Sequence, residues 1–249
     1  MAVMTIPRKY YPGIYPGKRY DPAEVAGLYI KAWEQKQMEQ RTKAAPEVEF
    51  PPGICFARQI GVGALEIADI LAARLGWRVA DRLILEEMAG SSEVTHKTVQ
   101  FFDERYPGGV SALAVLMFGE KSFTMGDYLR GLASVIYALA TSEPTIFVGR
   151  GAHLLLPRDR ILAVHLVGSR EFRARRIARI MDIRPEAANQ KIEDLDKEQG
   201  AYFKKLTGKR ERPTEEFDLL INCDQIADPQ WVADIVETAF RCKFGQIGF

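Results

Sequence analysis

The sequence predicts an α/β fold in which a central parallel sheet of five strands has helices on both faces. The main observation is that short apolar runs alternate with amphipathic helical segments from Ile54 onward, the order that produces a parallel sheet covered on both sides. Composition agrees, because 47% hydrophobic and 27% charged residues are typical of folded globular proteins. The length of 249 residues allows one main core with an appendage.

Residues 1–50 precede this alternation and differ from it. They contain the Pro-, Gly- and Tyr-rich segment YYPGIYPGKRYDP, a helical segment over residues 24–40, and the linker AAPEVEFPPG. Clustered Pro-Gly turns interrupt regular structure, so we expect an arm followed by a helix. The arm serves either as a packing appendage or as a contact in a homo-oligomer. We therefore divide the chain into an extension, 1–50, and a main domain, 51–249.

Five apolar runs of strand length follow, and we expect each to be a strand of the sheet. The third and fourth are near-continuous, which is typical of strands buried on both faces. The runs are ICFA, WRVAD, TIFVG, ILAVHLV and FDLLINC, beginning at residues 54, 77, 145, 161 and 217.

Helical segments lie between and after these runs. The first shows apolar residues at helical spacing until Gly76 ends it. We expect a helical insertion in the loose stretch at about 89–130, and a lid in the charged stretch at about 170–215. The expected helices span residues 64–75, 83–88, 110–118, 128–140, 170–181, 185–206 and 229–241.

Charge and cysteine content exclude several classes of function. The 34 Lys and Arg against 33 Asp and Glu leave a net charge of +1, which gives no global attraction to nucleic acid or membranes. Cys55, Cys223 and Cys242 are widely spaced, unlike a disulfide framework or a zinc site. The chain contains neither a signal-length apolar run at its start nor a membrane-length apolar stretch. We expect a cytoplasmic protein without nucleic-acid or membrane partners.

The segment ICFARQIGVGALEIADILAARLG carries the strongest chemical signal. Gly61 and Gly63 lie between a predicted strand and a helix start, where close backbone approach and the helix dipole favour phosphate. The pattern G-x-x-x-x-G-K-[ST] is not met, because Ala64 stands in the lysine position and Leu65 in the hydroxyl position. Alone, the segment fits either an anion site or a tight turn with glycines for packing.

Arginines at two other places fit an anion site. Arg150 lies between two glycines after a predicted strand, and ligands of open parallel sheets bind outside the carboxyl ends of the strands. The alternative is a surface or salt-bridged arginine. In the helix at 170–181, Arg175 and Arg179 share one face and Arg173 and Arg176 another. Either pair faces a ligand, or the whole face is solvated.

Four ordered segments resemble the cytidylate kinase-like family of nucleoside monophosphate kinases, over most of residues 53–241. ARQIGVGALEIA resembles that family's S-R-x-x-G-S-G-G-x-x-I-A, and FVGRGAHLLL its V-G-R-G-A motif. DKEQGAYFKKLTG and FDLLINCD resemble its D-K-x-R-A-x-Y-Y and Y-D-L-x-x-N segments. The resemblance implies a P-loop NTPase-like three-layer α/β/α fold, with ATP and Mg²⁺ used to phosphorylate a nucleoside monophosphate, CMP or dCMP by default.

The resemblance also implies roles for individual residues, with no protein ligand assigned to the metal. Helix capping remains an alternative for Asp81 and Asn222, and a simple ion pair for Asp196 and Lys197. The implied sites are Arg58, Gly61, Val62, Gly63, Ala64 and Leu65 for the donor phosphates, Arg150 and Asp81 for the acceptor, Arg175 and Arg176 for the transferred phosphoryl group, Asp196, Lys197 and Gln199 in the lid, and Asn222 near the adenine.

Two departures from the family pattern fall where phosphate would be held. The family's Ser-Gly-Gly is Val62-Gly63-Ala64 here, and the lid arginine is Gln199. Phosphoryl transfer depends on positioned cations, and losing one costs orders of magnitude in rate. The alternative to a kinase is therefore a nucleotide-binding protein with weak catalysis, acting as a sensor or interaction module. A third possibility is a structural partner protein that uses the Tyr/Pro arm.

Overall fold

The computed structural model describes residues 21–41, 50–91, 127–207 and 213–245. The expected arm, the helix expected at 110–118 and most of the expected insertion lie outside the described residues. The homo-oligomer contact through the arm therefore stays a prediction.

Five parallel strands form one sheet, which confirms the predicted fold class. Their order is β2-β3-β1-β4-β5, and every pairing is parallel. The central strand β1 ends between β3 and β4, at the point where the strand order reverses and ligands of open α/β sheets bind. The strands are β1 (Gly53–Arg58), β2 (Arg78–Asp81), β3 (Thr145–Val148), β4 (Ile161–Val167) and β5 (Leu219–Asn222).

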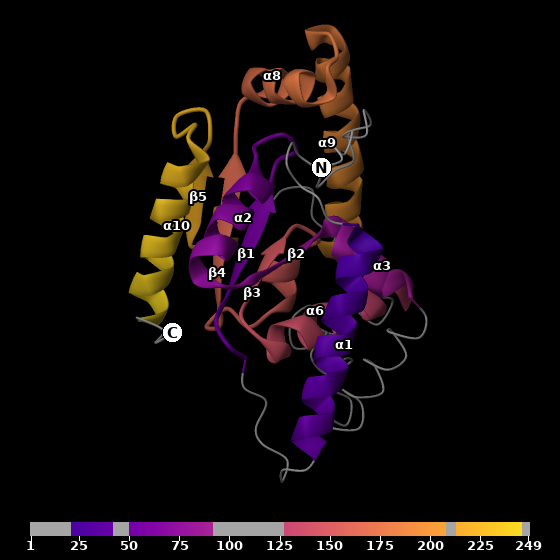
Figure 1. Cartoon of the computed structure of the whole chain (residues 1–249). Coiled ribbons are helices and arrows are strands. Elements are labelled where there is room, and N and C mark those ends of the chain that lie inside the picture. The colour runs from indigo at the N-terminus through magenta and orange to yellow at the C-terminus, as the bar shows by residue number, and fades with distance from the viewer. Residues whose placement is uncertain (1–20, 42–49, 92–126, 208–212, 246–249) are drawn as a thin grey trace, which may run out of the picture.

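Helices cover both faces of the sheet, giving three layers (Figure 1). One face packs against α2 (Ala64–Leu75) and α10 (Pro229–Phe244), and the other against α3 (Arg82–Gly90) and α6 (Asp127–Ser142). Successive strand residues point to opposite faces. Accordingly, Ile54 and Phe56 belong to the first apolar cluster, and Cys55 between them to the second.

The predicted helix of the extension is α1 (Pro22–Arg41), and it packs beside α3 and α6. Ala26 and Trp33 are buried, and the hydroxyl of Tyr29 donates to the carbonyl of Val79 over 2.9 Å. This helix is therefore a packing element of the main domain.

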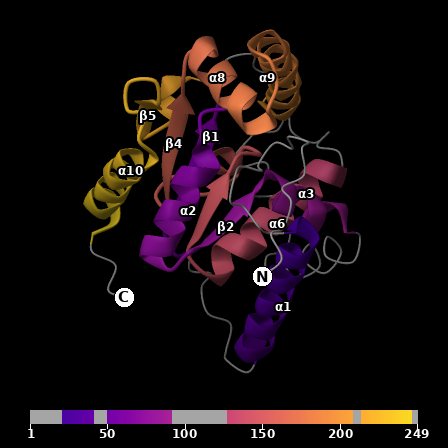
Figure 2. The ribbon, with the colours of Figure 1, turned by 45° about the horizontal axis from the view of Figure 1, so that its top comes forward.

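Two further helices lie at the carboxyl ends of the strands (Figures 1 and 2). They are α8 (Arg170–Met181) and α9 (Pro185–Thr207), the stretch predicted to be a lid. They form an apolar cluster of their own, and Ile60, from the loop that follows β1, is part of it. The α8–α9 pair is thus packed directly onto that loop.

Two short elements that the sequence did not predict complete the described structure, α7 (Ala152–Leu155) and the 3-10 turn η2 (Thr214–Glu216). Among the described helices, none combines the length and the apolar character that crossing a membrane requires.

Candidate functional site

The loop between β1 and α2, residues 59–63, is called the glycine turn. Gly61 has φ of +93° and Gly63 φ of +88°, values that only glycine adopts without strain. Gly63 is also the N-cap of α2, and it has no side chain to bond the first amides of the helix. These amides and the positive end of the helix dipole can therefore receive an anion.

Arg176 of α8 lies over the glycine turn. A Cβ atom on Gly63 would be 3.0 Å from Arg176 Nη2 and 3.1 Å from its Cζ. The guanidinium is mostly buried and pairs with Glu66 in the first turn of α2, with Nη2 and Oε2 2.7 Å apart. Arg176, a predicted site residue, thus brings positive charge to the turn where the lysine of the usual loop is missing.

Arg173, one turn earlier on α8, ties the turn to the helical pair. Its Nη1 donates to the carbonyl of Ile60 over 3.2 Å, and its guanidinium makes two 2.9 Å bonds to Asp196 of α9. Arg173 and Arg176 share a face because they are three residues apart. Of the two predicted arginines, Arg176 lies at the turn and Arg175 is exposed on α8, and Arg173 lies beside Arg176 at the turn.

Three side chains of the turn and of the start of α2 point into the core. Val62, Ala64 and Leu65 are 3%, 3% and 7% exposed and belong to the main apolar cluster. They contribute backbone to the site but no oxygen ligand for Mg²⁺. The described residues also contain no group of three His, Cys, Asp or Glu that could hold a metal. The residues therefore fit a phosphate chain better than a metal ion held by protein side chains alone.

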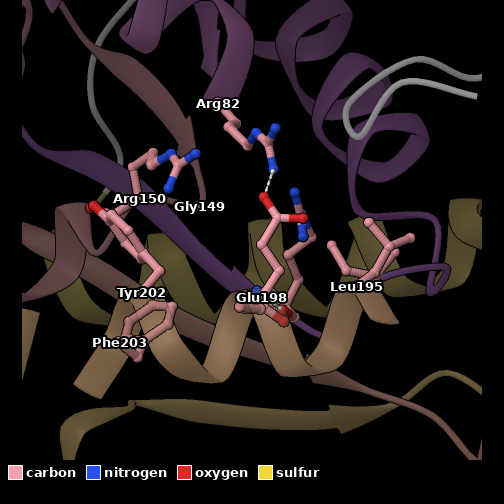
Figure 3. A pocket seen from close by; sticks show the side chains of 10 residues that line it. Arg82, Gly149, Arg150, Leu195, Glu198, Tyr202 and Phe203 are labelled. Atoms are coloured by element: carbon pink, nitrogen blue, oxygen red, sulfur yellow. Dashed lines mark hydrogen bonds and ion pairs between the residues drawn. The ribbon is translucent and has the colours of Figure 1, made fainter. Parts of the chain in front are cut away.

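A pocket opens beside the turn, between β1, β3, α3 and α9 (Figure 3). Its charged lining from the described residues is three arginines and one glutamate, and this lining favours an anion. Ile60 of the glycine turn also lines it, so the two sites are contiguous. We call it the arginine pocket and define it by Arg58, Arg82, Arg150, Glu198, Gln199 and Tyr202.

Arg58 lies in the arginine pocket. It is 7% exposed, and its Nη2 is 3.9 Å from the position of a Cβ atom on Gly149. The family resemblance placed Arg58 with the donor phosphates. In the structure its guanidinium faces the pocket, and Arg176 lies over the glycine turn.

Arg150 is held on several sides. Its φ is +53°, its guanidinium pairs with Glu86 of α3, and its Cζ lies 4.3 Å from the centre of the Tyr202 ring. The Tyr202 hydroxyl donates to the Arg150 carbonyl over 3.2 Å. Burial lowers the pKa of Arg150, and the charge of Arg82 lowers it further. Arg150 is thus salt-bridged and also lines the pocket, and its role toward a ligand stays a prediction.

Sequence reasoning missed Arg82, Glu86 and Tyr202. Arg82 Nε is 3.3 Å from Glu86 Oε2, and its Nη1 is 3.8 Å from Glu198 Oε1; the second contact is drawn in Figure 3. One signal was available, because Arg82 directly follows the strand end at Asp81, the position that made Arg150 a candidate. Tyr202 also had a signal, because it occupies the first tyrosine position of the motif D-K-x-R-A-x-Y-Y that DKEQGAYFKKLTG resembles. Glu86 lies within a helix and gave no such signal.

The remaining predicted residues have structural partners. Gln199 Nε2 donates to the Arg58 carbonyl over 3.0 Å, which fixes α9 to the end of β1. Asp81, 1% exposed, caps α3 by accepting from the Ile84 amide over 3.0 Å. Lys197 pairs with Glu193 on the exposed side of α9. Asn222 Oδ1 accepts from the Asp224 amide over 3.0 Å.

One solved structure supports the fold, and two others are less similar. An uncharacterized protein from Eubacterium ventriosum superposes with a TM-score of 0.60 at 16% sequence identity, covering 77% of this chain and 98% of that chain. A shikimate kinase from Bacteroides thetaiotaomicron has a TM-score of 0.41 at 14% identity, with coverage of 76% and 96%. A gluconokinase from Sinorhizobium meliloti has 0.41 at 16%, with coverage of 77% and 93%. No curated protein matches the sequence.

The family is shown by the sequence itself. The model of the cytidylate kinase-like family matches residues 53–225, a span that includes all five strands, the glycine turn and the α8–α9 pair. The match covers well over half of the chain, and the chain belongs to the cytidylate kinase-like family.

Proposed function

We propose that the protein is a phosphotransferase that moves the terminal phosphoryl group of ATP to a nucleoside monophosphate, with CMP or dCMP as the acceptor that the family suggests. One observation carries the proposal: two cationic sites lie side by side at the carboxyl ends of the strands, and Ile60 belongs to both. One site suits a donor phosphate chain and the other suits the phosphate of an acceptor.

The donor phosphates would bind at the glycine turn. The first amides of α2 and the guanidinium of Arg176 meet there, and a side chain on Gly63 would collide with that guanidinium. The side chains of Val62 and Leu65 are buried, so backbone amides and Arg176 would bind the donor phosphates. Mg²⁺ carried on the donor phosphates would neutralise charge on the moving group.

The acceptor phosphate would bind in the arginine pocket. Arg58, Arg82 and Arg150 reach it from the end of β1, the start of α3 and the end of β3. Guanidinium groups suit phosphate because their N–H groups match its oxygens in pairs. In the reaction, an oxygen of the acceptor phosphate attacks the terminal phosphorus of ATP, and ADP leaves. Holding the two phosphates in adjacent cationic sites supplies the positioning and charge on which this chemistry depends.

A coupled assay for ADP release, run with ATP and each ribo- and deoxyribonucleoside monophosphate, tests the proposal. We expect turnover with at least one acceptor. Arg150→Met should raise the KM for that acceptor more than it lowers kcat, since it removes a binding contact. Arg175→Met is the matched control, because it removes an exposed arginine. The proposal would be rejected if no acceptor gave turnover and no nucleotide raised the thermal stability of the protein.

A second candidate function is nucleotide binding with weak catalysis, as in a sensor. The observation that favours it is the contact of Gln199 with the Arg58 carbonyl. A neutral amide, bonded to the backbone, stands where the family pattern has a lid arginine, so α9 brings less charge to the transferred group. Stabilisation by ATP or CMP without ADP release would select this candidate, and Gln199→Arg would then be expected to raise turnover.

A further inference from the structure

Glu86 connects two arginines of the arginine pocket. One of its carboxylate oxygens, Oε1, contacts Arg150 Nη2, and the other, Oε2, lies 3.3 Å from Arg82 Nε. The two guanidiniums come from different elements, the β3–α7 turn and the first turn of α3. A single carboxylate thus bridges the two cations that face the proposed acceptor.

The bridged arginines are built to hold an anion. The Arg150 side chain is 12% exposed, and its guanidinium lies against the ring of Tyr202 and pairs with Glu86. A mostly buried cation needs a counter-charge. Carboxylates and phosphates both offer paired oxygens to guanidinium groups, so the partner of Arg150 can be exchanged for another oxyanion without moving the arginine.

The Glu86 side chain has room to move away from Arg150. Its side chain is 28% exposed, so its carboxylate can turn to solvent from a helix that stays in place. Arg82 keeps a second acid nearby, because its Nη1 is 3.8 Å from Glu198 Oε1. When the Glu86 carboxylate turns to solvent, Arg150 loses its contact with Glu86 and needs a new anionic partner.

We propose that Glu86 holds the place of the acceptor's phosphate in the ligand-free protein, and that binding exchanges this carboxylate for a phosphate dianion. The inference rests on the proposed function and specifies how its acceptor site selects a ligand. A ligand with one negative charge only replaces the charge that it displaces, whereas a dianion gains attraction to both arginines. Glu86 is therefore a specificity-determining residue, which favours phosphate monoesters over carboxylates.

Isothermal titration calorimetry on the full chain tests the exchange, with CMP, sodium sulfate, sodium acetate and ATP as probes at constant ionic strength. Glu86→Gln removes the competing charge. We expect it to bind CMP and sulfate about tenfold more tightly, the effect of removing a partly exposed ion pair from each of two arginines, and to gain measurable affinity for acetate. The affinity for ATP at the glycine turn should change less than that for CMP.

Glu87→Gln is the matched control. Glu87 is the next residue on α3 and is exposed, so the substitution makes the same change of net charge without touching Arg150. Its affinities for CMP and sulfate should stay within about twofold of the wild type. An equal gain in both variants would overturn the proposal, because a general charge effect would then explain it. An unchanged or weaker affinity for CMP and sulfate in Glu86→Gln would overturn it as well.

The same titrations separate this inference from the proposed function. If the wild type binds ATP and CMP and Glu86→Gln does not alter CMP binding, the exchange is wrong and the function stands. If no nucleotide binds but sulfate binds more tightly to Glu86→Gln, the function is wrong and the exchange stands. If Glu86→Gln does not fold, Glu86→Asp keeps the charge and withdraws it by one methylene. A smaller gain is then expected, and a loss of sulfate affinity would overturn the proposal.

Discussion

Gly63→Ala tests whether the glycine turn holds the donor phosphates. Gly63 has φ of +88°, and left-handed backbone costs an L-residue about 1–2 kcal/mol. The new methyl group would also lie 3.0 Å from Arg176 Nη2, so Arg176 would move and its partly buried pair with Glu66 would weaken by about 1 kcal/mol. We expect the free energy of unfolding to fall by about 2–3 kcal/mol in total.

Gly76→Ala provides the matched control at the other end of α2. Gly76 has φ of +67°, and a Cβ atom there would meet nothing within 4 Å. This variant therefore carries the backbone cost of about 1–2 kcal/mol without the collision. The difference between the two variants isolates the displacement of Arg176.

Urea unfolding gives the stability of both variants, and calorimetric titration with ATP gives their affinity. We expect Gly63→Ala to lose at least tenfold in ATP affinity, because the methyl group displaces the guanidinium over the turn, and Gly76→Ala to keep the affinity of the wild type. If Gly63→Ala binds ATP as tightly as Gly76→Ala does, the donor phosphates do not bind at this turn.

Further predictions concern the surroundings of the turn. Arg173→Met should lower the free energy of unfolding in urea by about 2 kcal/mol, since it leaves a buried carbonyl and a partly exposed carboxylate without their donor. Arg175→Met should stay within about 0.5 kcal/mol, and equal losses would contradict the assignment of Arg173 to the turn. Gln199→Ala should cost about 1 kcal/mol by removing the donor to the Arg58 carbonyl; unchanged stability would show that water replaces this bond. Burial raises the pKa of Asp69 to about 6, so its contribution to stability is present below about pH 4 and is lost as the pH rises through 6. Asp69→Asn should therefore raise the free energy of unfolding by about 2 kcal/mol at pH 7.5 and leave it nearly unchanged at pH 4, and a gain of the same size at both pH values would refute the buried carboxylate as its cause.

Hydrophobic pattern was sufficient to predict the sheet and most of the described helices. The run at 161–167 coincides with β4, and the helices expected at 64–75 and 170–181 coincide with α2 and α8. Their ends carry local signals that a sequence shows, such as Gly76 as the C-cap of α2 and Ser169 as the N-cap of α8. By contrast, α7 has four residues, too few for a periodic pattern to appear.

The sequence predicted which residues gather at the carboxyl ends of the strands but only some of their contacts. Arg150 and the glycines could be placed there because their positions follow from the fold class, and their roles toward a ligand stay predictions. The face of α8 that meets the turn could not be predicted, because Arg173 and Arg175 differ only in the direction of a side chain on a helix whose rotation is fixed by tertiary packing. The direction of the Arg58 side chain could not be predicted for a similar reason, since the end of β1 can direct it to either neighbouring site, and its role with the donor phosphates stays a prediction.

The net charge of +1 argued only against extended anionic partners, and the structure shows how it is compatible with two cationic sites. Four arginines around the turn and pocket pair with an acid from another segment of the chain. The pairs are Arg173–Asp196, Arg176–Glu66, Arg150–Glu86 and Arg82–Glu198. On the proposed function, such a site would recognise an anion by exchange, so its affinity would depend on what the ligand offers beyond a carboxylate. A phosphate chain would meet this condition at both places, through charge at the arginine pocket and through contacts with the amides at the glycine turn. The acids that neutralise the arginines would then contribute to recognition of the ligand as much as the arginines do.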